Sequence, residues 1–302
     1  MRKTAEDAYE AHRGAVWALC YRMMGSAADA DELLQDTFAR LLERPPSDTD
    51  APLRPWLFKV ALNLSRDRLR RRKQQSYVGP WLPGPIETDG LEGLETSPRA
   101  RYETMESVTL AFLRTLEALT PKQRAVLVLR DVYDLSVRET ATFLDLGESN
   151  VKVIHHRARE RMKHYDERRA TLDPALRQRI EQALAMLLGA LASGDEHAVR
   201  KALTEDVVFE SDGGGEYIAA LRPIVGADRV VRFLAGVRPK GPPRVAFREV
   251  NGLPAVLVEA EPSRPRAARR SVLTIEVTDT GQVSALRTVF ATDKLSGVRF
   301  DF

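Results

Sequence analysis

The chain has 302 residues, of which 43% are hydrophobic and 29% charged. This composition fits a globular protein of two or three domains and excludes a disordered or fibrous chain. The 46 Lys and Arg residues nearly balance 43 Asp and Glu residues, so a nucleic-acid site would have to come from local clustering of cations. One cysteine, Cys20, excludes an intrachain disulfide and a cysteine-based zinc cluster. The longest apolar stretch, residues 183–192, is about half of what a membrane-spanning helix needs. The N-terminus turns acidic where a signal peptide would be apolar, and we expect a cytoplasmic protein.

Residues 1–75 carry apolar side chains at helical spacing, without strand alternation. Between Asp29 and Leu42 the spacing predicts an amphipathic helix whose core stripe is Leu34, Phe38 and Leu41. Four acidic residues line its flank: Asp29, Glu32, Asp36 and Glu43. Such a face is usually only solvated, but it also suits docking to a basic partner.

A second helix is predicted to open at Trp56 and to run through Asn63 to Lys73. Five of the six residues from Arg68 to Lys73 are cationic. A cluster this dense suits melted or single-stranded DNA, since cations track the backbone while planar groups contact bases. The alternative is that the cations only complement the helix dipole. We expect Trp56 to lie in the core and the arginines to contact DNA.

Residues 76–104 contain four prolines and four glycines between Ser76 and Pro98, a composition that predicts a linker. Residues 105–169 are predicted to be helical again, and residues 175–302 to form a further domain. That domain opens with an amphipathic helix and continues with alternating, valine-rich runs that read as strands. The turn at residues 279–282 between two such runs predicts a hairpin.

The sharpest motif lies between Leu119 and Lys163, where three short helices are predicted in a helix-turn-helix. Thr120 and the following proline open the first helix, and Ser136 with Glu139 forms a capping box for the second, residues 137–144. Gly147 supplies the turn, and Ser149 is expected to cap the third helix.

The third helix is predicted to have one apolar stripe, Val151, Ile154 and Ala158, and one strongly basic side. When its apolar stripe packs against the rest of the domain, such a helix presents polar residues to base edges and cations to phosphates. A solvated basic helix in a plain bundle is the alternative. His155 and His156 are adjacent and lack a third ligand at helical spacing, so we expect no metal there.

Three stretches together resemble regions 2 and 4 of the extracytoplasmic-function (ECF) sigma factors of the sigma-70 family: residues 29–42, 55–72 and 119–162. Residues 175–302 resemble a SnoaL-like domain, the cone-shaped α+β fold shared with ketosteroid isomerase. The fold class implied is two all-α domains, sigma region 2 (1–75) and the helix-turn-helix of region 4 (105–169), followed by the α+β cone. With the linker motif at residues 81–85 and residues 293–295, the chain resembles the SigJ-type subgroup.

This resemblance implies an alternative sigma factor that binds the RNA polymerase core and initiates transcription at promoter DNA, with no membrane partner. Contact with the polymerase β′ clamp is implied for Glu32, Gln35, Asp36 and Phe38, and a contact with the β flap is implied as well. The −10 element is implied to be read by Asn63, Arg66, Arg70 and Arg71, with residues 45–52 capturing a flipped base. The implied −35 readers are Ser149, Asn150, Lys152, Val153, His156 and Arg157.

The cone and the linker are implied to regulate activity within the chain, through Trp81, Leu82, Pro83, Asp212, Gly213, Gly214, Asp293 and Lys294. Three departures from the subgroup pattern are Gly84, Glu216 and Ala291-Thr292. We expect no cofactor, no metal and no catalytic residue, although an unknown small ligand in the cone stays open. As an enzyme, the cone would use Asp212, Glu210 or His197 as a base. Asp212, next to three glycines, reads more simply as a turn residue. The other alternative is a polymerase-independent helix-turn-helix regulator with a ligand-binding or enzymatic C-terminal domain.

Overall fold

The computed structural model describes residues 2–48, 51–74, 77–91, 99–169, 171–237 and 239–302, with side chains from residue 6 onward. The chain folds as two compact units. Unit 1 comprises residues 1–76 and 89–169, and unit 2 comprises residues 77–88 and 170–302. The first part of the predicted linker therefore packs with the C-terminal unit. Residues 49 and 50 of the predicted base-capturing loop, and residues 76 and 92–98 of the linker, lie outside the described residues.

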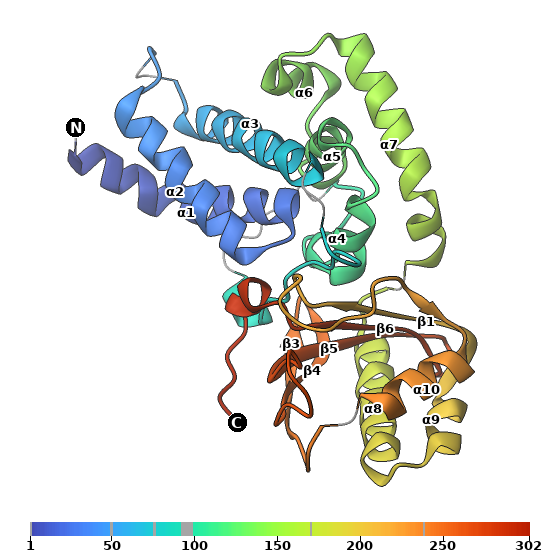
Figure 1. Ribbon diagram of the computed structural model, residues 1–302. Coiled ribbons are helices and arrows are strands. Elements are labelled where there is room, and N and C mark those ends of the chain that lie inside the picture. Colours follow the sequence, from blue (N-terminus) through green and yellow to red (C-terminus); the bar gives the residue numbers. More distant parts are fainter. Residues whose placement is uncertain (1, 49–50, 75–76, 92–98, 170, 238) are drawn as a thin grey trace. The chain divides into compact units, whose positions relative to one another are not determined.

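Unit 1 begins with three helices that pack on one another (Figure 1): α1 (Arg2–Met24), α2 (Ala27–Glu43) and α3 (Leu53–Gln74). Ser26 caps α2 by accepting a hydrogen bond from the backbone N–H of Asp29 at 3.3 Å. The predicted core stripe of α2 is confirmed, since Leu34, Phe38 and Leu41 are all buried. The expectation for Trp56 is wrong. Trp56 is only half-buried, and Phe58, half a turn further on, fills the core instead.

The remainder of unit 1 is also helical, after the short turn η1 (Thr88–Gly90) where the two units meet in sequence. Its elements are η2 (Glu106–Val108), α4 (Leu110–Leu116), α5 (Pro121–Leu127), the π-helical turn η3 (Val128–Val132), α6 (Val137–Leu144) and α7 (Glu148–Arg168). The predicted capping box at Ser136 and Glu139 is confirmed, and Thr120 forms a second one with Gln123. Local side-chain capping thus fixes where α5 and α6 start.

The prediction that Ser149 caps the third helix is wrong. Helix α6 ends at Asp145, which takes a left-handed conformation with φ 51°. The chain then turns so quickly that Gly147 becomes the N-cap of α7, without a side-chain hydrogen bond, and Ser149 lies inside the first turn. The apolar stripe is confirmed in Val151 and Ala158, which are buried together with Met162, while Ile154 is half-buried.

Unit 2 is an α+β fold in which three helices cover one side of a six-stranded sheet (Figure 1). The helices are α8 (Pro174–Ser193), α9 (Glu196–Ala202) and α10 (Ala227–Gly236). The strands are β1 (Leu203–Asp212), β2 (Ile224–Val225), β3 (Arg244–Val250), β4 (Leu253–Glu259), β5 (Arg270–Val277) and β6 (Val283–Val289), in the order β2-β1-β6-β5-β4-β3. Only the β1–β6 pair is parallel. The predicted hairpin between β5 and β6 is confirmed.

The core of unit 2 fills the space between the helices and the sheet. Val256, Leu273 and Leu286 point from the strands toward Leu184 and Leu187 of α8 in one continuous apolar cluster. Because side chains alternate along a strand, the neighbours of these residues point to the opposite face of the sheet. That second face carries Asp212, Arg270 and the other polar groups described below.

Among the described residues, no helix is long and apolar enough to cross a membrane. The same residues contain no group of three or more His, Cys, Asp or Glu side chains placed to hold a metal ion.

Candidate nucleic-acid interface and linker clasp

Helix α7 presents its polar side to solvent. The six residues that the sequence assigned to −35 recognition are all exposed: Ser149, Asn150, Lys152, Val153, His156 and Arg157. They occupy the N-terminal half of a helix whose other side is anchored by buried Val151 and Ala158. This is the arrangement that a helix needs to enter a DNA groove, with its N-terminal residues nearest the bases.

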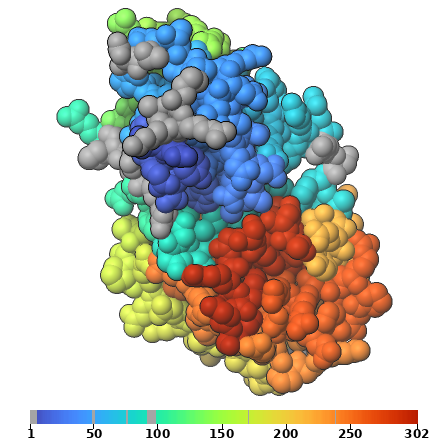
Figure 2. All heavy atoms as spheres, turned by 90° about the vertical axis from the view of Figure 1, so that its left-hand side faces the viewer, coloured from blue at the N-terminus to red at the C-terminus, as the bar shows by residue number. Residues whose placement is uncertain are grey.

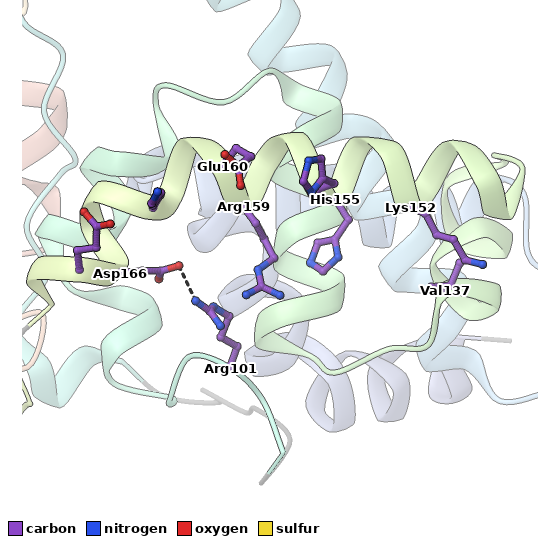
Figure 3. A pocket seen from close by; sticks show the side chains of 10 residues that line it. Arg101, Val137, Lys152, His155, Arg159, Glu160 and Asp166 are labelled. Carbon is purple, nitrogen blue, oxygen red and sulfur yellow. Dashed lines mark hydrogen bonds and ion pairs between the residues drawn. The ribbon is translucent and has the colours of Figure 1, made fainter.

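A hollow of about 540 Å³ runs along α7 and is bordered by basic side chains (Figure 3). Lys152, His155 and Arg159 extend from the helix toward it. Arg101, from the segment before α4, reaches Asp166 at 2.6 Å. The charge of this hollow is mixed, since Glu160, Asp166 and Glu167 line it together with Arg101, Lys152, Arg159 and Lys163.

His155 does not belong to the solvent side of α7. Its Nε2 lies 2.7 Å from a carboxylate oxygen of Asp131, a buried residue of η3. The two neighbouring histidines therefore separate in role: His155 ties α7 to η3, and His156 stays exposed.

The residues assigned to −10 recognition lie along α3. Arg66 donates to the side-chain oxygen of Asn63 at 3.3 Å, and both residues are half-buried. Burial, and then the neighbouring charge of Arg70, lowers the pKa of Arg66 below its usual value. Arg70 is exposed and pairs with Asp67, and Arg71 is exposed as well. These four side chains form one partly solvated, cationic stretch of helix.

The last residues of α3 also form contacts within unit 1. The Nη2 group of Arg72 donates to both carboxylate oxygens of Glu117, at 2.9 Å each. Glu117 also accepts from Arg124, which is 2% exposed and donates to the backbone oxygen of Met23 at 2.7 Å. We call Arg72, Glu117 and Arg124 the Glu117 cluster. It ties the first three helices to α4 and α5, and sequence spacing gave no signal of it.

The two arginines favour the charged form of the Glu117 carboxylate. Burial alone would raise the pKa of Glu117, but the charges of Arg124 and Arg72 outweigh it and lower that pKa below its usual value. Two further contacts join the same parts: Lys73 donates to the backbone oxygen of Leu119 at 2.6 Å, and Lys59 pairs with Asp145 at 2.7 Å. The predicted DNA-tracking role thus does not apply to Arg72 and Lys73 in this arrangement.

On α2, the assigned polymerase-binding residues divide into surface and core. Glu32, Gln35 and Asp36 are exposed, and Glu32 pairs with Arg68 of α3. Phe38 is 8% exposed and packs edge-on against Tyr9 of α1, with ring centroids 5.0 Å apart. Phe38 therefore packs α2 against α1, and a contact between Phe38 and polymerase stays a prediction.

In unit 2, the linker is held by a buried ion pair. The Asp212 carboxylate, at the end of β1, and the Lys294 ammonium lie 2.6 Å apart, and both side chains are at most 3% exposed. Lys294 also donates to the backbone oxygen of Leu82 at 2.7 Å, and its ammonium lies 4.0 Å from the ring centre of Trp81. Asp212 accepts from the backbone N–H of Leu82 at 2.7 Å and from the Tyr77 hydroxyl at 2.5 Å.

We call these five residues, Tyr77, Trp81, Leu82, Asp212 and Lys294, the linker clasp. The turn interpretation of Asp212 is incomplete: its carboxylate does accept from the N–H of Gly214 at 3.0 Å, but it is chiefly the acceptor for the linker.

The other assigned regulatory residues support the clasp. Pro83 is buried beside it. A side chain at Gly213 would collide with the Phe290 ring at 2.7 Å and the Tyr217 carbonyl at 2.8 Å, and Gly214 has a left-handed φ of 61°. Glycine is therefore needed at both positions. Asp293 is exposed in η4 (Thr292–Ser296), one residue before Lys294.

Past the clasp, Ile86 and Glu87 of the linker form isolated backbone bridges with unit 2. Ile86 and Asn251 exchange two hydrogen bonds of 2.9 Å, one of them through the Asn251 side chain. Glu87 forms a bridge with Val250 and accepts from the Arg299 backbone and guanidinium groups. Backbone pairing and charge thus fix residues 77–88 to unit 2.

Comparison with known proteins supplies the family. Residues 8–75 match the sigma-70 region 2 model and residues 109–162 the sigma-70 region 4 model. Over 96% of this chain and 92% of the relative, the sequence is 31% identical to the ECF RNA polymerase sigma factor SigJ of Mycobacterium tuberculosis. The chain belongs to the ECF sigma factors.

One further relative and one solved structure agree with that membership. The sigma factor shares 29% identity with the probable ECF sigma factor SigI of M. tuberculosis, over 74% of this chain and 73% of the relative. The crystal structure of M. tuberculosis SigJ matches with a TM-score of 0.72 at 28% identity, covering 98% of this chain and 99% of that one. An alternative sigma factor with regions 2 and 4 and a C-terminal α+β domain, the predicted fold class, is thereby confirmed.

Proposed function

We propose that this sigma factor joins the RNA polymerase core in the cytoplasm and directs it to promoters. In this proposal α7 reads the −35 element, and Asn63, Arg66, Arg70 and Arg71 of α3 contact the −10 element. The observation that carries it is the exposure of all six assigned residues on the polar side of α7, over a buried apolar stripe. The exposed acidic residues of α2 would meet the β′ clamp, and region 4 the β flap.

We further propose that unit 2 regulates the sigma factor in cis and is not an enzyme. All four donors to the Asp212 carboxylate come from the protein itself, so Asp212 is not available as a base. Glu210 is paired with Arg287 at 3.2 Å, and His197 is exposed rather than set in an apolar pocket. The clasp instead binds the linker between regions 2 and 4 to unit 2. Through this linker, unit 2 would control how the two regions are arranged.

Transcription in vitro with purified core polymerase tests both statements. We expect the full chain to bind core polymerase and to start transcripts from a subset of genomic fragments. We expect a chain ending after Arg169, which lacks the partner of the clasp, to differ in activity. A chain that binds duplex DNA but never core polymerase would instead be a polymerase-independent regulator.

Charge reversal on α2 is expected to weaken polymerase binding. Asp36 is exposed at the centre of the acidic face, so Asp36→Arg should lower the affinity for core polymerase at least tenfold, or about 1.4 kcal/mol. The affinity is measured by fluorescence anisotropy of labelled protein. Glu10→Arg, an equal charge change at an exposed site on α1, is the matched control and should bind as the wild type does. Equal affinity for all three would reject the α2 surface.

Removing one phosphate contact from α7 is expected to change the salt dependence of promoter binding. Arg157→Ala should weaken binding and reduce the slope of log affinity against log salt by about one unit. Arg168→Ala removes the same charge from the exposed last turn of α7 and should leave the slope unchanged. The slope is measured by titrating holoenzyme onto promoter DNA at several salt concentrations. If the two variants share the wild-type slope, Arg157 does not contact phosphate.

A further inference from the structure

Unit 2 contains a cavity of about 500 Å³ beside η4. Its walls include three aromatic rings, Tyr217, Phe290 and Phe300, and two arginines, Arg269 and Arg270. The side of η4 closes it with Thr292, Leu295 and Ser296. A volume of this size, with apolar walls and a few charged groups, is typical of sites for small organic molecules.

Arginines outnumber acids around Glu259, at the edge of this cavity. Glu259 of β4 stands opposite Arg244 of β3 on one side and Arg270 of β5 on the other. Arg244 also donates to the Phe302 backbone oxygen at 3.0 Å, and a second carboxylate, Glu216, accepts from the lining residue Thr292. Arg269 and Arg270 reach Glu259 through their Nε atoms and are 73% and 53% exposed, so their outer guanidinium N–H groups face the cavity and solvent as donors for a further anion.

Arg270 is also held in position. The Arg270 guanidinium lies 5.1 Å from the centre of the Phe300 ring, and its Nε donates to Glu259 at 3.0 Å. A guanidinium fixed by a ring and a carboxylate loses little freedom when it binds a ligand. The cavity thus combines a pre-positioned cation with aromatic walls.

This cavity is separate from the interior of the cone. Arg270 precedes Leu273 by three residues on β5, so the two side chains point to opposite faces of the sheet. Leu273 belongs to the apolar cluster that fills the space under α8. The other walls come from Tyr217, Arg269 and Phe290 and from η4 with the segment that follows it. The residues of η4 and of that segment, dark red in Figure 2, form part of the molecular surface. A ligand would therefore enter from the face opposite the helices.

We propose that this cavity binds a small organic anion with an aromatic or aliphatic body, such as an arylalkanoic or medium-chain carboxylate. The carboxylate pairs with Arg269 and Arg270, and the apolar body packs between Tyr217, Phe290 and Phe300. Lys294 lies in η4 between the lining residues Thr292 and Leu295. A ligand in the cavity would therefore contact Leu295, the residue next to Lys294 of the linker clasp. An effect of the ligand on the clasp rests on the proposed regulation in cis, whereas the binding itself does not.

Binding is tested on the full chain without polymerase or DNA, so that its outcome does not depend on the proposed function. The probes are 4-fluorophenylacetate and octanoate, with 4-fluorophenylacetamide as the uncharged analogue, followed by calorimetry and by ¹⁹F NMR for the fluorinated pair. We expect saturable binding of at least one carboxylate below about 10 mM and at least tenfold weaker binding of the amide. No saturable binding of either carboxylate, or equal binding of acid and amide, would overturn the proposal.

Variants place the binding in the cavity. The double variant Arg269→Gln/Arg270→Gln should bind the carboxylate at least tenfold more weakly. Ser296→Phe keeps both arginines and fills the cavity, so it should weaken binding as well. Arg264→Gln, which removes an exposed charge outside the lining, should bind as the wild type does. Undiminished affinity in both the double and the filling variants would overturn the assignment even if one of the two were poorly folded.

Discussion

Replacing Lys294 by methionine is expected to destabilise unit 2 by about 3–5 kcal/mol, because it leaves a buried carboxylate without its cation. Asp212 is fully buried and would keep only the hydrogen bonds from Tyr77, Leu82 and Gly214. The linker should be released at the same time, since Lys294 also holds the Leu82 carbonyl. Urea unfolding gives the free energy, and limited proteolysis within residues 77–88 reports the release.

A double variant separates the buried charge from the shape of the site. Asp212→Leu combined with Lys294→Met removes both charges, and it should recover part of the lost stability because a buried pair replaced by apolar groups costs less than an orphaned ion. Lys240→Met, at an exposed position of unit 2, is the control for loss of one ammonium group. If Lys294→Met has the unfolding free energy and the proteolysis pattern of the wild type, the clasp neither stabilises unit 2 nor holds the linker.

Replacing Glu117 by alanine is expected to loosen unit 1 by a similar amount, about 3–5 kcal/mol. Arg124 is 2% exposed and would lose the carboxylate that compensates its charge. Because Arg72 and Arg124 reach Glu117 from α3 and α5, the variant should also let the two sigma regions separate. The separation is measured by electron paramagnetic resonance between spin labels on Arg40→Cys and Thr142→Cys, both exposed sites.

The native thiol should not interfere with this labelling, since burial raises the pKa of Cys20 to about 12 and a thiol without thiolate character is unreactive. Lys59→Ala is the matched control. It breaks the Lys59–Asp145 pair, which joins the same parts of the unit but is solvent-exposed, and should cost less than about 1 kcal/mol. An unchanged label distance in Glu117→Ala would mean that apolar packing alone holds the two regions together.

The helices of unit 1 could be predicted where the signal is local. The capping residues Thr120 and Ser136 act within three residues of themselves, and both were identified from the sequence. The prediction for Ser149 failed because a serine near a helix start acts as a cap only if the helix begins directly after it. The left-handed conformation of Asp145 lets α7 begin two residues earlier, with Gly147 as its N-cap. Trp56 was misplaced because periodicity gives the face of a helix but not which side chain on it reaches the core, whereas Phe38 is buried as its place in the apolar stripe predicts.

The candidate sites differ in how far the sequence could reach. The polar side of α7 follows from helical spacing, and its exposure agrees with that. The clasp joins Leu82 to residues 130 and 212 positions away, and no spacing rule connects them. Family resemblance named Trp81, Leu82, Asp212 and Lys294, but it missed Tyr77 and gave no indication that Asp212 accepts from Tyr77, Leu82 and Lys294 together. The Glu117 cluster could not be predicted for the same reason. In addition, a run of cations has the same sequence pattern whether it contacts DNA or a buried carboxylate.

The fixed position of residues 77–88 shortens the usable tether between the two promoter-reading parts. Gln74 ends α3 and Leu110 begins α4, and the chain between them connects the two sigma regions. Residues 77–88 of this connection pack with unit 2, and Tyr102, with 0% exposure, is held in the core of unit 1. Each held segment is subtracted from the chain that can extend freely, at about 3.4 Å per residue. If unit 2 regulates the sigma factor in cis as proposed, undoing the clasp would return up to about 40 Å of chain and widen the range of promoter spacings that the two regions can span.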